Sequence, residues 1–242
     1  MSSKRVPTDR IEFRPHSVDW TEQKVARFWD YLAETDAGEF FSEKHSRDIA
    51  GMLIQIAHPG AVVDIGCGTG ALAAELGRRG VRAVGVDSSE DALRAASARA
   101  PDASFRLGSV ASLPLADDSM DAALLIEVVE HLDDATLGAT LTEARRVLRQ
   151  RGVLLVTTPN AETLSASTRE CPDCGARFHI YQHVRRWTRE SLHAALADHA
   201  FRPQVREVRF VENGPWPEVL ARRVYYRLRG HRPRLMAIAV KP

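Results

Sequence analysis

The feature that most constrains the fold is an apolar run, AVVDI at residues 61–65, that passes directly into a glycine-rich turn, GCGTG at residues 66–70. The run is typical of a buried strand, and the residues after the turn are typical of a helix. Glycines let the backbone approach a ligand closely, and a helix N-terminus offers unpaired N–H groups. The segment therefore predicts a strand, a ligand-binding loop and a helix, in that order.

The chain beyond this segment alternates between strand and helix patterns. We expect strands at 61–65, 82–86, 104–107, 122–126 and 153–158, and helices at 70–79, 89–99, 134–149 and 189–199. Repeated units of this kind predict an α/β fold, with a parallel sheet that helices cover on both faces. Two more strands, near 204–211 and 234–240, suit an antiparallel pair that closes the sheet.

Two amphipathic helices precede the first strand. The first carries Val25, Phe28, Trp29 and Leu32 at helical spacing, and the second runs from about Ser42 to Ala57. Residues 1–18 have no periodic pattern and are expected to form an irregular arm. We therefore divide the chain into an N-terminal arm with a helical cap at 1–59 and a second domain at 60–242.

Composition and charge exclude several classes of protein. Hydrophobic residues make up 44% and charged residues 27% of the 242 residues, which excludes wholesale disorder. No apolar run reaches the roughly 18 residues of a membrane span, and no secretory signal begins the chain. Three cysteines do not make a disulfide framework, so we expect a cytoplasmic protein. The net charge of +1 predicts no polyanionic partner, although residues 201–242 carry ten basic side chains against three acidic ones.

Two cofactor classes fit the glycine turn. The pattern Gly66-x-Gly68-x-x-Ala71, with Asp87 farther on, also fits the dinucleotide fingerprint of a nicotinamide oxidoreductase. Asp64 distinguishes the two, because a carboxylate beside a pyrophosphate would repel it by about 1–4 kcal/mol. The same carboxylate attracts the sulfonium and ammonium groups of S-adenosylmethionine, unless it only hydrogen-bonds the glycine turn. S-adenosylmethionine is therefore the favoured ligand.

Several blocks of sequence then occur in a recognisable order. The blocks are VVDIGCGTG, VGVDSS, SFRLGSVASLPLADDSMDAALLIEVVEHL, RRVLRQRGVLLVTTPN and HVRRWTRESL. On these blocks, over about residues 60–240, the chain resembles the class I S-adenosylmethionine-dependent methyltransferases. The resemblance implies a Rossmann-like, doubly wound, seven-stranded sheet whose last strand, within LMAIAVKP, is antiparallel. It also implies that residues 60–242 form a methyltransferase domain with S-adenosylmethionine as methyl donor.

The resemblance also implies which residues bind the donor. Gly66, Gly68 and Gly70 would surround its methionine part, and Asp87 would bind the ribose hydroxyls. Where many relatives have Gly-Asp-Ala near the adenine, this chain has Gly108-Ser109-Val110, and Ser109 can still accept a hydrogen bond. The expected donor-binding residues are Asp64, Gly66, Cys67, Gly68, Gly70, Asp87, Ser88, Ser109, Val110 and Glu127, with Cys67 as a small apolar filler.

Glu127, Glu130 and His131 follow the fourth strand and share one face of a helical turn. With His183 they resemble the divalent-metal site of small-RNA 2′-O-methyltransferases, where a metal would help to deprotonate a hydroxyl. Without a metal, His131 would act as general base and Glu127 would line the donor pocket. A purely structural turn is the third interpretation. We expect Glu127, Glu130, His131 and His183 to be the catalytic residues, with His131 as the base.

The insert at about 159–188 contains a cysteine–histidine pattern. Cys171, Cys174, His179 and His183 have the spacing C-x2-C-x4-H-x3-H, which suits a structural zinc ion. His183 could instead belong to the acceptor pocket, and the cysteines could be two ordinary thiols. These alternatives stay open on the sequence alone.

The acceptor is the least defined part of the function. The chain resembles methyltransferases of saccharide and secondary-metabolite biosynthesis in the segments FWDYLAE, EFFS and CPDCGARFHIYQHVRRWT. This resemblance implies a hydroxyl acceptor on a sugar, glycan intermediate or natural product. RNA is not the expected acceptor, because no separate RNA-binding domain fits the remaining length. Arginines at 222–229 suit contact with an acidic membrane or a phosphorylated acceptor, or a solvated face. A non-catalytic accessory protein that binds S-adenosylmethionine is the alternative class.

Overall fold

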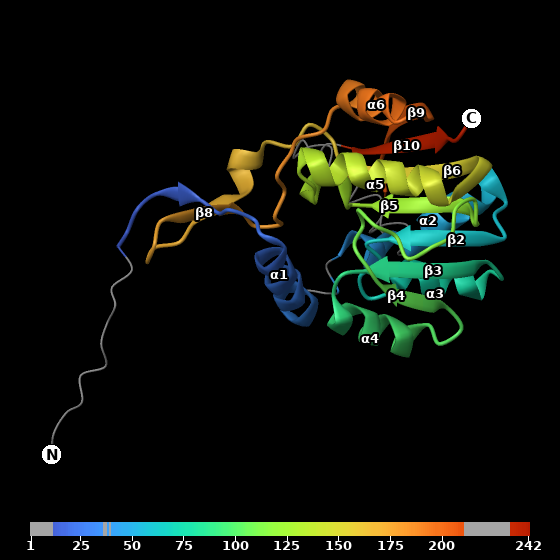
Figure 1. Cartoon of the computed structure of the whole chain (residues 1–242). Helices are drawn as coiled ribbons and strands as arrows, with labels where there is room; N and C mark the ends of the chain where they lie inside the picture. The colour runs from blue at the N-terminus through green and yellow to red at the C-terminus, as the bar shows by residue number, and fades with distance from the viewer. Residues whose placement is uncertain (1–11, 36–37, 39, 211–232) are drawn as a thin grey trace, which may run out of the picture.

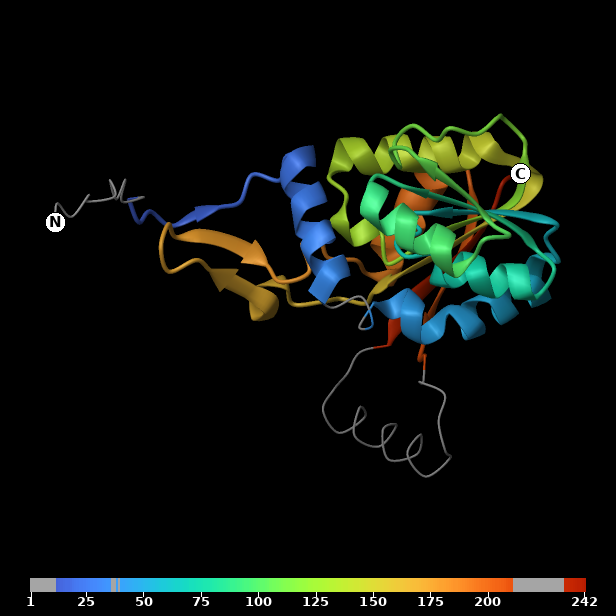
Figure 2. The same cartoon turned by 90° about the horizontal axis from the view of Figure 1, so that it is seen from below.

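The computed structural model describes residues 12–35, 38, 40–210 and 233–242. Their strands form a seven-stranded sheet and a separate three-stranded sheet, and the latter projects from one end of the larger body (Figures 1 and 2). The basic segment around residues 222–229 lies outside the described residues. No helix of the described part is long and apolar enough to cross a membrane.

The seven-stranded sheet has the architecture expected from the sequence. Its strands, in spatial order, are β4 (Ser104–Leu107), β3 (Arg82–Asp87), β2 (Ala61–Ile65), β5 (Met120–Ile126), β6 (Leu148–Pro159), β10 (Arg234–Val240) and β9 (Arg202–Val208). The first five are parallel, whereas β10 is antiparallel to both of its neighbours. The Rossmann-like fold with an antiparallel last strand is therefore confirmed.

Helices cover both faces of this sheet because neighbouring residues of each strand point to opposite sides. The helices are α1 (Glu22–Thr35), α2 (Phe41–Ala57), α3 (Ala71–Arg78), α4 (Glu90–Arg99), α5 (Asp134–Val147) and α6 (Arg189–Asp198). α2 and α3 share one apolar cluster with Val62 and Leu124, whereas α5 and α6 share the other with Val63 and Leu125. The helix expected to end at residue 149 ends at Val147, because β6 begins at Leu148.

The insert folds into a ribbon, where the sequence analysis found only aperiodic sequence. It contains η3 (Leu164–Ser167) and the antiparallel hairpin of β7 (Thr168–Glu170) and β8 (Ala176–His179), and β1 (His16–Ser17) pairs in parallel with β8. Part of the expected irregular arm is thus a strand. Gly175 has φ +78°, and a Cβ on it would lie 2.6 Å from the Arg14 backbone, so the arm crosses the turn at a glycine. β1 and β7 have two and three residues, which are too few for an alternating pattern to be recognised in the sequence.

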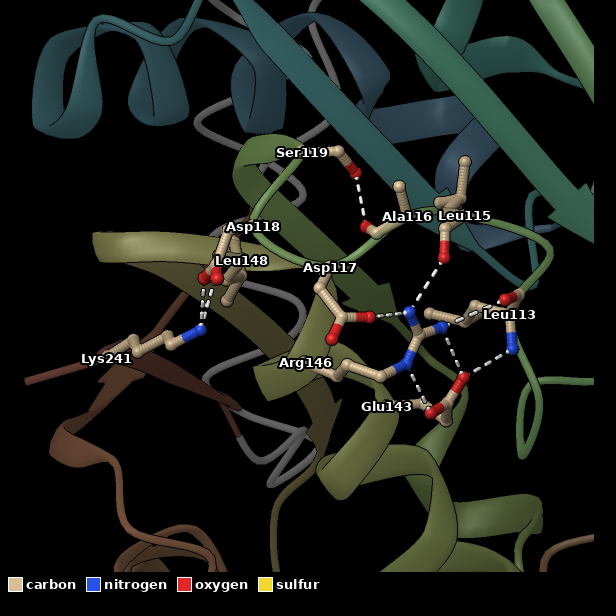
Figure 3. Close-up of polar contacts among 10 residues, drawn as sticks. All are labelled: Leu113, Leu115, Ala116, Asp117, Asp118, Ser119, Glu143, Arg146, Leu148 and Lys241. Carbon is tan, nitrogen blue, oxygen red and sulfur yellow. Dashed lines mark hydrogen bonds and ion pairs between the residues drawn. The ribbon is translucent and has the colours of Figure 1, made fainter.

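One arginine on α5 fixes the segment that leads into β5 (Figure 3). One edge of the Arg146 guanidinium binds both carboxylate oxygens of Glu143, through Nε at 2.7 Å and Nη2 at 2.8 Å. The same group donates to Asp117 at 2.6 Å and to the carbonyl oxygens of Leu113 and Leu115 at 3.0 and 2.7 Å. The hydrogen bonds to Glu143 and Asp117 raise the pKa of Arg146 above its usual value. Arg146 therefore sets the path of the chain into the strand that ends at the candidate site.

We predict that Arg146→Ala lowers the free energy of unfolding by about 2–3 kcal/mol, because two carbonyl groups and Glu143 lose a charged donor. Arg146→Lys keeps the charge but not the planar fork, so it should recover only part of the loss. The measurement is urea unfolding of the full chain. The matched control is Arg94→Ala, an exposed arginine paired only with Asp91 in the described structure, which should cost less than about 0.5 kcal/mol. Equal losses in the two alanine variants would contradict this role.

Candidate active site

The carboxyl ends of β2, β3, β5 and β6 meet along one edge of the seven-stranded sheet, since these strands are parallel. In open α/β sheets, ligands bind along this edge. The glycine turn, the segment after β5 and the start of the insert all leave the sheet here. Most of the residues singled out in the sequence therefore lie within one region of the molecule.

Asp87, at the end of β3, holds the glycine turn in place. Its Oδ2 accepts the N–H of Gly68 at 2.8 Å, and its Oδ1 accepts the N–H of Ser89 at 3.0 Å. Burial raises the pKa of Asp87, and these N–H groups together with that of Ser88 partly offset the increase. The carboxylate thus joins β3, the glycine turn and the start of α4.

The glycines of the turn serve different purposes. Gly70 has φ +75°, and a Cβ there would lie 2.8 Å from the Cβ of Ala96, so this glycine is required by packing. A Cβ on Gly68 would have no atom within 4 Å, although its φ is +49°. The backbone at Gly68 is therefore exposed to open space that a ligand can occupy. Cys67 is buried with its Sγ beside Gly85, and burial raises the pKa of its thiol, as suits an apolar filler.

Asp64 lies on β2 beneath this turn and is buried. Burial, followed by the charge of Asp87, raises the pKa of Asp64 to about 7. A cation bound above the turn would favour the ionised form of this carboxyl group. The arrangement is therefore suited to a positively charged ligand group.

Ser109, the expected adenine contact, already forms hydrogen bonds within its own loop. Ser109 Oγ accepts the N–H of Ala111 at 3.2 Å, and Ser109 forms a short bridge with Ser112. Val110 packs at the edge of the apolar core. The contacts of Ser109 and Val110 with a ligand stay predictions.

Glu127, directly after β5, has an unusual backbone conformation for a residue with a side chain, with φ +55°. Its Oε2 forms an ion pair with Arg234 at 2.7 Å, and its Oε1 is buried with no hydrogen-bond partner. The sequence analysis missed Arg234 as a site residue, because it considered this position only as the start of an expected strand at 234–240. Of the expected set, Glu130, His131 and His183 have potential ligand atoms within 4.8 Å of one another, whereas Glu127 is not part of this group.

Glu130 and His131 are held within the same region. Glu130 is buried and its Oε2 accepts the hydroxyl of Thr158 at 3.0 Å; burial, then the charge of Glu127, raises its pKa well above the usual value. Burial of the His131 ring, then the neighbouring His183, lowers the pKa of His131 to about 3. A histidine with this pKa is a weak proton acceptor at neutral pH, which argues against His131 as the general base.

The insert contributes a second group of polar side chains. His183 Nδ1 lies 2.5 Å from Glu162, and His179 Nε2 lies 3.4 Å from the other oxygen of the same carboxylate. The His179 and His183 rings stack at 4.5 Å, and the His183 ring lies 4.9 Å from that of His131. The sequence analysis missed Glu162, although its position just after an expected strand at the ligand edge could have indicated it.

Helix α1 closes this region from the N-terminal side. Trp29 packs edge-on against His131 at 4.8 Å and donates its indole N–H to Gln182 at 3.3 Å. Asp30 accepts the hydroxyl of Ser89 at 2.7 Å. The helical cap therefore reaches both the donor side and the histidine side of the site.

The structure does not bring the expected zinc ligands together. Cys171 and Cys174 flank the turn of the ribbon, whereas His179 ends β8 and His183 follows it. An extended strand advances about 3.3 Å per residue, so β8 carries the histidines away from the thiols. In the described part of the chain, the clusters with metal-ligand spacing are Glu130, His131 and His183, and Glu162, His179 and His183; neither includes a cysteine.

Comparison with known proteins finds similarity to methyltransferases, which is concentrated in the central part of the chain. Residues 63–156 match the model of a methyltransferase domain family. A protein of Mycolicibacterium smegmatis described as an S-adenosylmethionine-dependent methyltransferase is 39% identical over 104 residues, which cover 43% of this chain and 40% of that protein. The O-methyltransferase resE of Aspergillus sclerotiorum is 28% identical over 72% of this chain and 67% of its own length. The chain spans less than half the length of some of the curated relatives that it matches.

Solved structures agree on the fold. The 1,6-didemethyltoxoflavin-N1-methyltransferase of Burkholderia thailandensis, solved with its substrate and S-adenosylhomocysteine, superposes with a TM-score of 0.66. The match covers 94% of this chain and 93% of the Burkholderia chain, at 19% identity. At this identity the likeness concerns the fold alone.

We predict that S-adenosylhomocysteine binds about tenfold more tightly at pH 8 than at pH 6. Its ammonium group favours ionised Asp64, and a carboxyl group with a pKa of about 7 is about one-tenth ionised at pH 6. Isothermal titration calorimetry across this range measures the change. Asp64→Asn should bind more weakly and lose the pH dependence, whereas the exposed control Asp102→Asn should retain it.

The same group has an opposite effect on the stability of the ligand-free protein. Asp64 ionises near pH 4 in the unfolded chain but near pH 7 in the folded one, so its contribution to stability decreases as the pH rises from about 4 to 7. Asp64→Asn should remove this decrease in thermal unfolding. Identical pH dependence of binding in the wild type and Asp64→Asn would contradict the assignment of Asp64 to the ligand site.

Proposed function

We propose that this chain, which carries a class I S-adenosylmethionine-dependent methyltransferase domain, methylates a hydroxyl group of a sugar, glycan intermediate or small natural product. The proposal rests chiefly on one observation: the open glycine turn lies at the same sheet edge as a cluster of histidines and carboxyl groups. A methyl donor and a group that receives a proton are the two requirements of O-methylation.

The donor side is supported by charge and space. Asp64 lies beneath the glycine turn, and Asp87 accepts a hydrogen bond from the turn. The backbone of the turn at Gly68 is left open to a ligand. Buried carboxyl groups favour the cationic methionine part of S-adenosylmethionine over the pyrophosphate of a nicotinamide cofactor. This supports binding of the methionine part at Gly66, Gly68 and Gly70 and of the ribose at Asp87.

The acceptor side is supported by the histidines and by the enclosing helix. Neutral imidazole groups accept a proton from a hydroxyl group near neutral pH. Trp29 and the exposed Tyr181 add aromatic surface beside polar groups, a combination that suits a ring-shaped polar molecule. The name of the relative resE, an O-methyltransferase, agrees with an oxygen acceptor.

The arrangement gives less support to metal-assisted methylation of RNA. Glu127 forms an ion pair with Arg234, and burial followed by the charge of Glu127 raises the pKa of Glu130 well above its usual value, which disfavours its ionised, metal-binding form. His179 Nδ1 accepts the N–H groups of Tyr181 and His183, so the proton lies on the Nε2 that faces Glu162. A metal ion at this nitrogen would have to displace the proton that is directed toward Glu162. Hydrogen-bonded catalysis without a metal is therefore the function we favour.

We expect the purified chain to transfer label from methyl-labelled S-adenosylmethionine into a ribonuclease-resistant saccharide or small-molecule pool of a host extract. Asp87→Asn should reduce the transfer about tenfold or more, because a charge-assisted hydrogen bond worth about 1.5–3 kcal/mol is lost. Asp102→Asn is the matched control and should retain the activity.

Other outcomes of this assay are equally informative. Label in ribonuclease-sensitive material would favour the RNA alternative. Binding of S-adenosylhomocysteine with no labelled product in any fraction would favour a non-catalytic accessory protein. Either result would contradict the proposed function.

A further inference from the structure

The loop after β6 places one carboxylate between two histidines. Glu162 Oε2 lies 2.5 Å from His183 Nδ1, and its Oε1 lies 3.4 Å from His179 Nε2. The His179 and His183 side chains are more than nine-tenths buried, whereas Glu162 keeps 23% of its side chain exposed. Glu162, His179 and His183 belong neither to the turn after β5 nor to the glycine turn, so the roles of those two segments do not account for them.

The hydrogen bonds determine which nitrogen of each ring carries a proton. His179 Nδ1 faces the N–H groups of Tyr181 at 3.2 Å and His183 at 3.3 Å, so it has to be the unprotonated nitrogen. The proton of His179 is then on Nε2, which faces Glu162. The carboxylate therefore has one oxygen beside His179 and the other available to accept from His183 Nδ1–H.

This arrangement leaves His183 with an unprotonated Nε2. A neutral imidazole that donates through Nδ1 has its lone pair on Nε2. His183 belongs to the cluster with Glu130 and His131, at the sheet edge that the acceptor has to approach. The ring is thus oriented as a proton acceptor, with a carboxylate behind it that stabilises the imidazolium ion when it forms.

His183 and His131 differ in the group that would stabilise each of them as an imidazolium ion. Burial alone would raise the pKa of Glu162, but the hydrogen bond from His183 and the charges of His183, His179 and Arg234 outweigh it and keep the pKa below its usual value. His131 has instead a long contact to a backbone carbonyl, with Nδ1 at 3.5 Å from the oxygen of Gln182. A carboxylate stabilises an imidazolium ion more strongly than a distant carbonyl does.

We propose that His183 is the proton acceptor of the transfer, and that Glu162 and His179 are positioning residues that fix its tautomer and orientation. This inference rests on the proposed O-methylation. The acceptor oxygen forms a bond to the methyl carbon, the carbon–sulfur bond breaks, and its electron pair stays on sulfur as S-adenosylhomocysteine. The hydroxyl proton goes to His183 Nε2 and is later released to water.

The first test needs no acceptor molecule. Two-bond ¹H–¹⁵N spectra of the histidine-labelled full chain with S-adenosylhomocysteine distinguish the two neutral tautomers, and His183→Gln and His179→Gln assign the signals. We expect the Nδ1–H form for His183 and the Nε2–H form for His179, with Glu162→Gln abolishing the preference of His183. An Nε2–H form of His183 in the wild type would overturn the proposal.

The second test uses the labelled donor and the host extract. Glu162→Gln should lower the transfer rate about 100-fold and His183→Asn by about 10²–10⁴-fold, with affinity for S-adenosylhomocysteine changed less than twofold. Because the two residues act as one unit, the double variant should be no slower than His183→Asn alone. The matched control is Glu170→Gln, which removes a carboxylate of the ribbon paired with Arg177.

The two tests separate this inference from the proposed function. Independent, multiplicative losses in Glu162→Gln and His183→Asn, or a larger loss in His131→Asn than in His183→Asn, would overturn the role of His183. Wild-type protein that labels nothing would instead contradict the proposed function, and the tautomer spectra would still decide whether Glu162 orients His183.

Discussion

The two hydrogen bonds that Asp87 accepts from the backbone of the glycine turn and of α4 are the interaction on which the rest of the site depends. A carboxylate is costly to bury unless N–H groups surround it, and here those groups belong to the segments that a ligand has to touch. The turn is therefore held open at Gly68 while Gly70 packs tightly against α4. With Asp64 below, the donor region combines fixed backbone with negative charge, which suits a cationic methyl donor.

The second part of the site comes from segments that are distant in sequence. The loop after β6 brings Glu162, the end of the insert brings His183, and α1 adds Trp29. The ribbon gives these segments a common anchor, because β1 in the N-terminal arm pairs with β8 in the insert. Helix α1 and the end of the insert thus meet at the sheet edge, where Trp29 contacts His131 and Gln182. This supports treating acceptor recognition as a property of both segments together.

The regular core could be predicted from the sequence, since strands such as 61–65 and 104–107 have the same bounds in the structure, and the motifs implied the antiparallel last strand. The individual partners of the site could not. Arg234 pairs with Glu127, and Glu162 pairs with His183. The partners in each pair are far apart in the sequence, and no local periodicity indicates such a pairing. The zinc pattern failed to assemble for a related reason: spacing along the chain suggested four ligands, but the extended backbone of β8 separates thiols from histidines. Short strands such as His16–Ser17 carry too little pattern to be recognised.

The most direct test of this account is a crystal structure of the chain with S-adenosylhomocysteine. We predict that the homocysteine part lies against Gly66, Gly68 and Gly70, with its ammonium group nearest Asp64 and its ribose hydroxyls on Asp87. Its sulfur should then face the group of Glu130, His131 and His183, where the acceptor would bind. A ligand bound away from the glycine turn, or with its sulfur directed away from His183, would contradict the account.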